Sequence, residues 1–122
     1  MSIREQLSQM AARPFRKVDI DGLEVWLRAP SPHQQNLHQT LQIDPKTLEW
    51  SSERYSLAKC VLICACVVEG EGGEPSFDQS NLQQEAEKLN NEWNARLVDS
   101  LYERCAEMLT DYDGEVKEQA KN

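Results

Sequence analysis

The stretch CVLICACVVEGEGG, residues 60–73, decides the fold, because nine apolar residues run directly into a loop of glycine and glutamate. A serine cap at Ser51 or Ser52 followed by this apolar run predicts a helix over about Glu53 to Val67. The loop of residues 69–75 is expected to turn back as a small hairpin and to bring residues 76–77 alongside residues 67–68. We therefore expect a central helix with a tight reversal at its end.

The three cysteines of this stretch suit a metal site, a reactive thiol or a packed core. On a helix Cys66 lies about 200° round from Cys64, so three ligands cannot converge, and Cys105 stands alone rather than in a second zinc-binding pair. Apolar neighbours raise the pKa of a thiol, and the C-terminal half of a helix disfavours a thiolate. We predict that the cysteines, including Cys60, are small core residues.

No motif of a known catalytic type occurs in the sequence, which lacks G-x-S-x-G, a phosphate-binding loop and H-E-x-x-H. His33 and His38 are about 140° apart on a helix and do not form a pair on one face. The glutamates of the Gly/Glu loop are expected to point into water rather than to hold a divalent ion. The sequence therefore predicts a protein that is not an enzyme, with no catalytic residue, no metal and no cofactor.

The segment FRKVDIDGLEVWLR, residues 15–28, predicts a β-hairpin, because Asp21-Gly22 suits a two-residue turn between alternating apolar residues. One face of the hairpin is expected to be apolar and directed toward the core. Its members are Val18, Ile20, Leu23, Val25 and Leu27. Trp26 lies on the other, polar face, where either another part of the chain or a partner protein covers it.

Capping signals divide the rest of the chain into helices. They predict helices over residues 3–12, from Ser31-Pro32 onward, in a short turn from Asp44 through Leu48, and from Ser80 with Gln83 onward. The last region carries a continuous apolar stripe at helical spacing. Its members are Leu82, Ala86, Leu89, Trp93, Leu97 and Leu101. A break into two helices is expected at Asn90-Asn91, and the end of the stripe either packs against the central helix or offers an apolar surface to a partner.

Composition excludes several classes of function. The chain has 122 residues and a net charge of −8, and residues 69–122 carry fourteen acids and five bases. Such an acidic half disfavours binding to nucleic acid, and no apolar run reaches the ~20 residues that span a bilayer. The N-terminus has charges where an export signal needs apolar residues. We expect one mostly α domain with a small N-terminal β-hairpin (α+β) over residues 1–110, built as a compact bundle of about four to five helices, and a flexible acidic tail over residues 111–122.

The order of these features resembles the tail assembly chaperones of long-tailed, non-contractile bacteriophages. Three segments carry the resemblance: WLRAPSP (residues 26–32), LAKCVLICACVVEGEGGEPSF (residues 57–77) and DQSNLQQEAEKLNNEWNARLVDSLYERCAEML (residues 78–109). In that family a middle helix leads into an acidic or glycine turn, a Phe, a short capped helix and a longer helix. Phe77 matches the Phe of the turn, and Arg28 with Pro30 and Ser31 matches the exit from the hairpin.

The resemblance implies a non-enzymatic assembly factor of the host cytoplasm that is absent from the mature virion. Such proteins bind the tape-measure protein, keep it soluble and recruit the major tail protein, and they tend to self-associate. The candidate partner-binding residues are Trp26, Arg28, Trp93, Leu97 and Leu101, with neither nucleic acid nor membrane as a partner.

Three other functions remain open at this stage. The first is a small structural or adaptor protein of the virion, such as a tail completion or connector subunit, which would stay in the finished particle. The second is an enzyme or metalloprotein that uses Cys60, Cys64 and Cys105. The third is an unrelated regulator.

Overall fold

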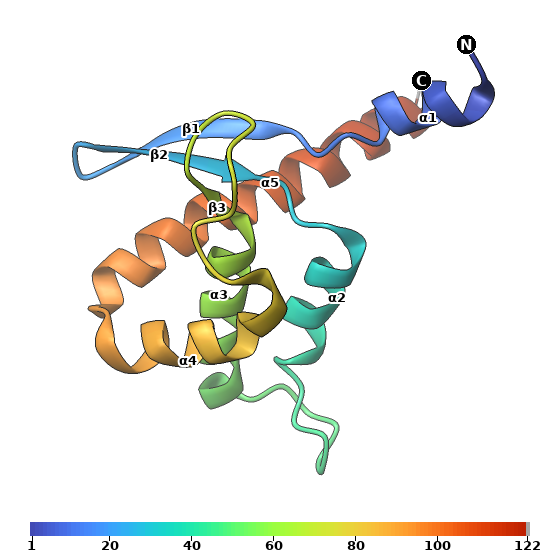
Figure 1. Ribbon diagram of the computed structural model, residues 1–122. Coiled ribbons are helices and arrows are strands. Elements are labelled where there is room, and N and C mark those ends of the chain that lie inside the picture. The colour runs from blue at the N-terminus through green and yellow to red at the C-terminus, as the bar shows by residue number, and fades with distance from the viewer. Residues whose placement is uncertain (122) are drawn as a thin grey trace.

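The computed structural model describes the backbone of residues 1–121 and the side chains of residues 1–109 (Figure 1). The elements in chain order are α1 (Ile3–Met10), β1 (Phe15–Ile20), β2 (Leu23–Arg28), α2 (Pro32–Thr40), α3 (Ser52–Cys66), β3 (Val67–Val68), the 3-10 turn η1 (Gln79–Asn81), α4 (Leu82–Glu92) and α5 (Ala95–Lys121). The expected fold class, mostly α with an N-terminal hairpin, is confirmed. The tail expected at residues 111–122 lies outside the residues whose side chains are described, so the predicted domain limits stay predictions.

Helix α3 is the centre of the molecule. Its N-terminus is capped by Ser51, whose hydroxyl accepts a hydrogen bond from the backbone N–H of Arg54. Every side chain from residue 60 to residue 66 is fully buried, and α3 packs against α2, α4 and α5. A helix that is apolar on all sides must be enclosed by its neighbours. The central helix predicted from residues 60–68 is therefore confirmed.

The predicted hairpin is confirmed with its register. Val18 pairs with Val25 and Ile20 with Leu23, and the turn puts both Asp21 and Gly22 at positive φ, as a tight two-residue turn requires. The predicted apolar face differs at one position. Leu23, beside the turn, stays 67% exposed, although its cross-strand partner Ile20 is buried.

A third strand completes the sheet. β3 follows α3 directly and pairs antiparallel with β2, which gives the order β1-β2-β3. Trp26 lies opposite Val68 and Leu27 opposite Val67. No pattern in the sequence predicts this pairing, which anchors the hairpin to the end of the central helix.

The Gly/Glu loop after α3 turns back as predicted. The Glu69 N–H donates to the carbonyl oxygen of Glu74 at 2.9 Å, and the Ser76 N–H donates to that of Val67 at 3.1 Å. At Gly73 a Cβ would lie 2.7 Å from the backbone nitrogen of Gly70, so only glycine fits without a shift of the backbone. The loop thereby places Phe77, the residue after Ser76, beside the end of α3.

Two predicted helix boundaries are wrong by a few residues. Asp78, not Ser80, provides the cap before the last helical region, because its carboxylate accepts hydrogen bonds from Ser80 and Asn81. These bonds also lower the pKa of Asp78. The break into two helices falls at Trp93 rather than at Asn90-Asn91, because Asn94 caps α5 by accepting from the N–H of Leu97 at 2.8 Å.

The segment between α2 and α3 makes the predicted short turn from Asp44 through Leu48, which the Leu48 N–H closes by donating to the Asp44 carbonyl oxygen at 2.7 Å, and the turn does not extend into a longer helix. Ile43 and Trp50 form an isolated antiparallel bridge, and the Asp44 N–H donates to the Glu49 carbonyl oxygen. Leu48 has a φ of +61°, which no helical residue adopts. The segment projects below the helices in Figure 1.

Burial shields the cysteines from solvent. All four are fully buried, and burial raises the pKa of Cys64 to about 12. A hydrogen bond that the Cys105 thiol donates to Cys66, together with burial, raises the pKa of Cys105. Among the described residues no group of His, Cys, Asp and Glu is arranged to hold a metal ion. The prediction that the cysteines are small core residues is confirmed by their burial.

We expect the native thiols to react with a disulfide reagent such as Ellman's reagent only when the protein unfolds. At pH 7 a pKa of about 12 leaves about one Cys64 in 10⁵ as thiolate. Gln9→Cys, on an exposed helix, is the control, and its new thiol should react within seconds. In denaturant all four native thiols should become reactive together. Rapid reaction of a native thiol in the folded protein would contradict this.

No helix in the described part of the chain is long and apolar enough to cross a membrane.

Candidate protein-binding groove

An apolar groove of about 240 Å³ lies between the hairpin, the loop after α3 and the start of α5. Its apolar lining comes from four separate parts of the chain. The principal members are Leu23 and Val25 of β2, Phe77 of the loop, and Trp93, Leu97 and Leu101 at the junction of α4 and α5. Asp21 lies at its edge. The apolar side chains of these segments are only partly buried where the segments meet, and their exposed parts form the groove.

The junction of α4 and α5 presents Trp93 to the groove. Trp93 has an extended backbone, with φ −84° and ψ 150°, and this ends α4 just before the Asn94 cap. Its indole is 38% exposed and meets the ring of Phe77, with 6.1 Å between the ring centroids. The two rings form an aromatic wall that the chain itself does not cover.

The stripe predicted from helical spacing divides between core and groove. Leu82, Ala86, Leu89 and Leu101 are buried, and Leu97 is half-buried. Leu101 is therefore the floor of the groove, whereas Trp93 is its open wall. One part of the stripe is therefore packed in the core, and another part is exposed as an apolar surface, which are the two alternatives that the sequence left open.

The other two predicted site residues lie elsewhere. Strand alternation puts Trp26 and Arg28 on the face of β2 opposite Val25. Trp26 is half-buried between its cross-strand neighbours Lys17 and Val68. Arg28 is also half-buried, and its Nε is the buried side-chain nitrogen without a hydrogen-bond partner in the described residues. The structure therefore brings together three of the five predicted residues.

Sequence reasoning missed Leu23, Val25 and Phe77 as site residues. Leu23 and Val25 were assigned to the core face of the hairpin, and Phe77 only to a turn. The predicted reversal at residues 69–75 was a signal for Phe77, because the reversal places Phe77 beside β3, the strand that follows α3.

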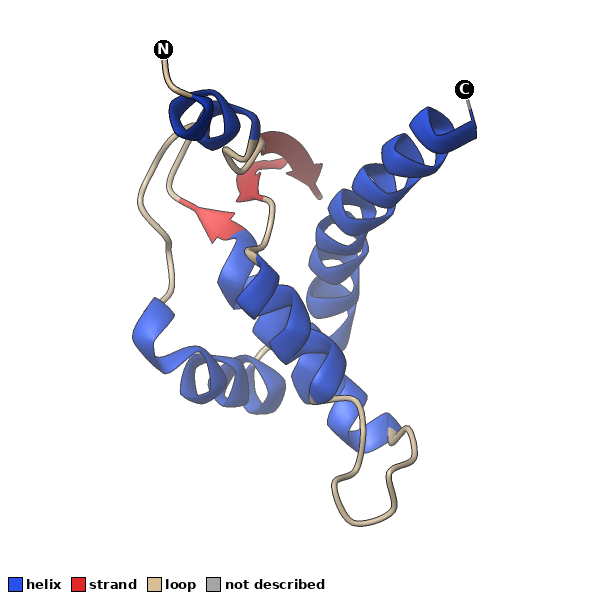
Figure 2. Ribbon diagram, turned by 90° about the vertical axis from the view of Figure 1, so that its right-hand side faces the viewer, coloured by secondary structure: helices blue, strands red, loops and turns tan. Residues whose placement is uncertain are grey.

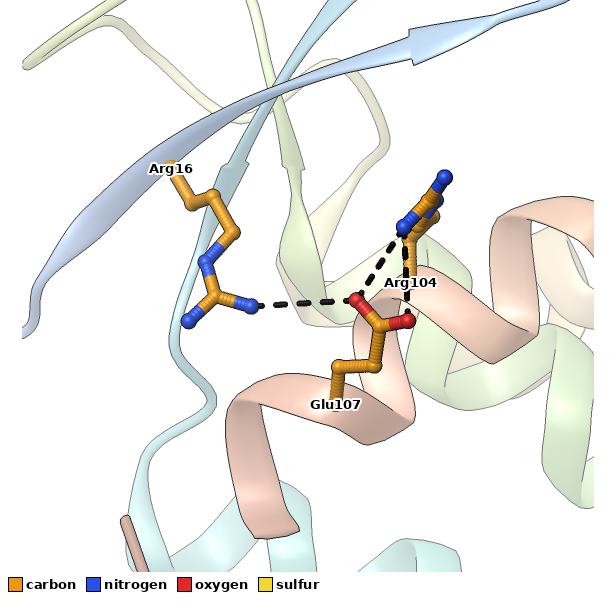
Figure 3. Close-up of polar contacts among 3 residues, drawn as sticks. All are labelled: Arg16, Arg104 and Glu107. Carbon is orange, nitrogen blue, oxygen red and sulfur yellow. Dashed lines mark hydrogen bonds and ion pairs between the residues drawn. The ribbon is translucent and has the colours of Figure 1, made fainter. Parts of the chain in front are cut away.

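An ion-pair cluster joins β1 to α5. Glu107 lies 3.9 Å from the Nη1 of Arg16 and 3.3 Å from that of Arg104 (Figure 3). These side chains are 36–46% exposed, so each pair contributes no more than about 1 kcal/mol. Burial of Ile20 and Leu27 therefore contributes more than these ion pairs to the position of the hairpin.

A larger recess of about 610 Å³ lies between α2 and α4 and is mostly polar. Its two central amides are already engaged. Gln34 donates to Gln79 at 2.9 Å and accepts from Arg13 at 2.6 Å, and Gln79 donates to the Cys64 carbonyl oxygen. These bonds connect α2 to η1 and α3, so the polar groups of the recess stabilise the fold. The apolar groove is therefore the better candidate for binding a protein.

By its fold the chain is a mostly α protein in which an N-terminal antiparallel sheet covers one end of a central helix. The structure of the bacteriophage HK97 tail assembly chaperone has a similar fold. The two superpose with a TM-score of 0.61 and 18% sequence identity, over 86% of this chain and 98% of that chain. No sequence profile of a known protein family and no curated protein matches the chain. The resemblance drawn from the sequence is thus confirmed at the level of the fold.

Proposed function

We propose that this protein is a non-enzymatic tail assembly chaperone of a long-tailed phage. The observation that carries the proposal is the fold shared with the HK97 tail assembly chaperone over 86% of the chain. The protein binds the tape-measure protein, keeps it soluble and recruits major tail subunits. It acts in the host cytoplasm without a cofactor and is absent from the mature virion.

The apolar groove supports this proposal as the site for an apolar, helical client. Trp93 and Phe77 form an aromatic wall of a kind enriched where proteins bind one another. Helix-in-groove recognition requires such a partly open apolar trough. The net charge of −8 keeps a complex with an apolar client in solution.

Co-expression with fragments of the tape-measure protein from the same genome tests the proposal. We expect the wild-type protein to keep a fragment soluble and to elute with it on a sizing column. Trp93→Ala should lower the affinity at least about tenfold, since a central aromatic of an interface contributes about 2 kcal/mol or more. Trp50→Ala, which removes an exposed indole outside the groove, is the matched control and should bind normally.

Two outcomes would count against the proposal. If no fragment is kept soluble, the chaperone function is wrong. If mass spectrometry finds the protein in purified virions, it is a structural or adaptor subunit. Thermal unfolding of Trp93→Ala separates a lost contact from a lost fold.

A further inference from the structure

Two arginines are neighbours at the open end of the hairpin, away from its turn. Arg28 is the last residue of β2, and the Nε of Arg13 donates to the carbonyl oxygen of the next residue, Ala29, at 2.7 Å. A second bond, from the Nη2 of Arg13 to the Oε1 of Gln34 at 2.6 Å, fixes the Arg13 guanidinium. Burial lowers the pKa of Arg13, and the positive charge of Arg28 lowers it further. The fold therefore holds two like charges close together.

Neither arginine has a counter-charge among the described side chains. The ion pairs of those side chains involve other bases, which are Arg16, Lys17, Lys59, Lys88 and Arg104. The Nε of Arg28 is buried and has no hydrogen-bond partner in the same part of the chain. A charged donor that is buried without an acceptor lowers stability. In the isolated chain Arg28 is therefore a source of instability, and a ligand that supplies an acceptor would remove it.

The arginine pair is separate from the groove. Strand alternation puts Arg28 on the face of β2 opposite Val25, which lines the groove. The groove also reaches Asp21 in the turn, whereas the arginines lie at the other end of the hairpin, roughly 17–20 Å away along the six residues of β2. Figure 1 shows α1, which ends just before Arg13, opposite that turn. The far end of α5 overlaps α1 in that view, but Figure 2 shows the two helices apart.

The chemistry of two neighbouring guanidinium groups favours an oxyanion as the ligand. A planar guanidinium presents its donors as a fork that matches the two oxygens of a carboxylate, and such a pair is stronger where water is partly excluded. Both arginines are half-buried. A long polyanion such as nucleic acid is repelled by the net charge of −8, whereas a carboxylate brings one negative charge to two positive ones. A carboxylate is therefore the favoured ligand.

We propose that Arg13 and Arg28 form a binding site for a carboxylate side chain of a partner protein. Arg28 provides the unpaired guanidinium, and Arg13, which its own hydrogen bonds hold in place, adds the second positive charge. A carboxylate bound to Arg28 supplies the acceptor that its Nε lacks and offsets the repulsion between the two arginines. The site lies away from the groove and can be occupied at the same time, so the inference does not rest on the chaperone function.

NMR titration of the full chain, labelled with nitrogen-15, tests the inference. The probe is a tripeptide of glutamate that is acetylated and amidated at its ends. We expect the Nε–H signals of Arg13 and Arg28 to shift and to saturate at constant ionic strength. Arg28→Met should weaken this binding at least about tenfold, because it removes a hydrogen bond to a charged group. Arg4→Met, which removes the same charge from the exposed helix α1, is the control and should bind as the wild type does.

Inorganic phosphate at the same ionic strength separates the two sources of an oxyanion. Weaker binding of phosphate than of the tripeptide supports a protein carboxylate as the ligand, and tighter binding of phosphate would overturn that assignment. The absence of a saturable shift of the Arg28 signal at about 20 mM tripeptide would overturn the site itself.

Thermal unfolding distinguishes a binding role of Arg28 from a structural one. Without ligand, Arg28→Met should unfold at the wild-type temperature or a few degrees above it, because methionine keeps an apolar stem but removes the unpaired donor and the like charge. The tripeptide should raise the unfolding temperature of the wild type and not that of the variant. An unfolding temperature of Arg28→Met below that of the wild type would show that Arg28 stabilises the fold, and the inference would then be wrong.

Discussion

Leu62→Ala will lower the free energy of unfolding by about 3 kcal/mol, a large part of the 5–15 kcal/mol that stabilises a typical domain. Leu62 is fully buried on the one helix that packs against α2, α4 and α5. Truncation removes apolar contacts on a helix that cannot move to fill the cavity, because its neighbours hold it on every side. Urea unfolding followed by circular dichroism measures the loss.

Two control variants test the reason for that loss. Leu48→Ala makes the same change at a side chain that is 78% exposed, and it should alter the free energy of unfolding by less than about 0.5 kcal/mol. Cys64→Ala, on the same buried helix, changes the volume little and should cost about 1 kcal/mol. A loss below about 1 kcal/mol for Leu62→Ala would mean that α3 is not the enclosed centre of the fold.

The elements that could be predicted are those with local signals. The Ser51 cap, the Asp21-Gly22 turn and the Ser31-Pro32 start each fix a backbone conformation within a few residues, and all three are confirmed. The pairing of β3 with β2 joins segments about forty residues apart and has no local signal. The β2–β3 pairing forms because packing of the apolar core places the end of α3 against the hairpin.

Helix ends were less predictable where two caps compete. Ser80 has a capping pattern of its own, but the Asp78 carboxylate accepts several hydrogen bonds and begins the turn two residues earlier. Asn90 suggested a break, yet its side chain accepts from the Ser56 hydroxyl and stays within α4. Asn94 caps the next helix instead. A short sequence pattern does not distinguish a capping Asn from one that contacts a neighbouring helix.

The candidate site was predictable in part for the same reason. Leu97 and Leu101 lie four residues apart on α5, so their common face follows from periodicity, whereas Trp93 lies at the break between α4 and α5 and joins them through the turn. Leu23 and Phe77 join them only through the tertiary fold. Trp26 was placed on the polar face of the hairpin, and strand alternation then puts it opposite Val25, outside the groove.

His38 makes the stability of the protein depend on pH. The ring is 4% exposed, with Nδ1 3.0 Å from the carbonyl oxygen of Ala58 and Nε2 3.1 Å from the hydroxyl of Tyr102. Nδ1 carries the proton and donates to Ala58, and Nε2 accepts from Tyr102 and from the amide of Gln42. Burial lowers the pKa of His38, and the bond to Ala58 only partly offsets this effect.

The direction of the pH dependence follows from proton linkage. Below about pH 6.5 the unfolded chain binds a proton at residue 38 that the folded protein resists, so stability falls as the pH falls. The slope can reach about 1.4 kcal/mol per pH unit for one proton, and it ends below the folded pKa, where both states are protonated.

We therefore expect urea unfolding of the wild-type protein to show falling stability from pH 7 to pH 5. His38→Phe should lose stability at pH 7, because Tyr102 and Ala58 lose their partner, but its stability should depend less on pH in this range. His33→Gln, at an exposed histidine, should keep the wild-type slope. An equal slope for the wild type and His38→Phe would show that protonation of His38 does not oppose folding, and that its polar contacts are satisfied equally well by the charged ring.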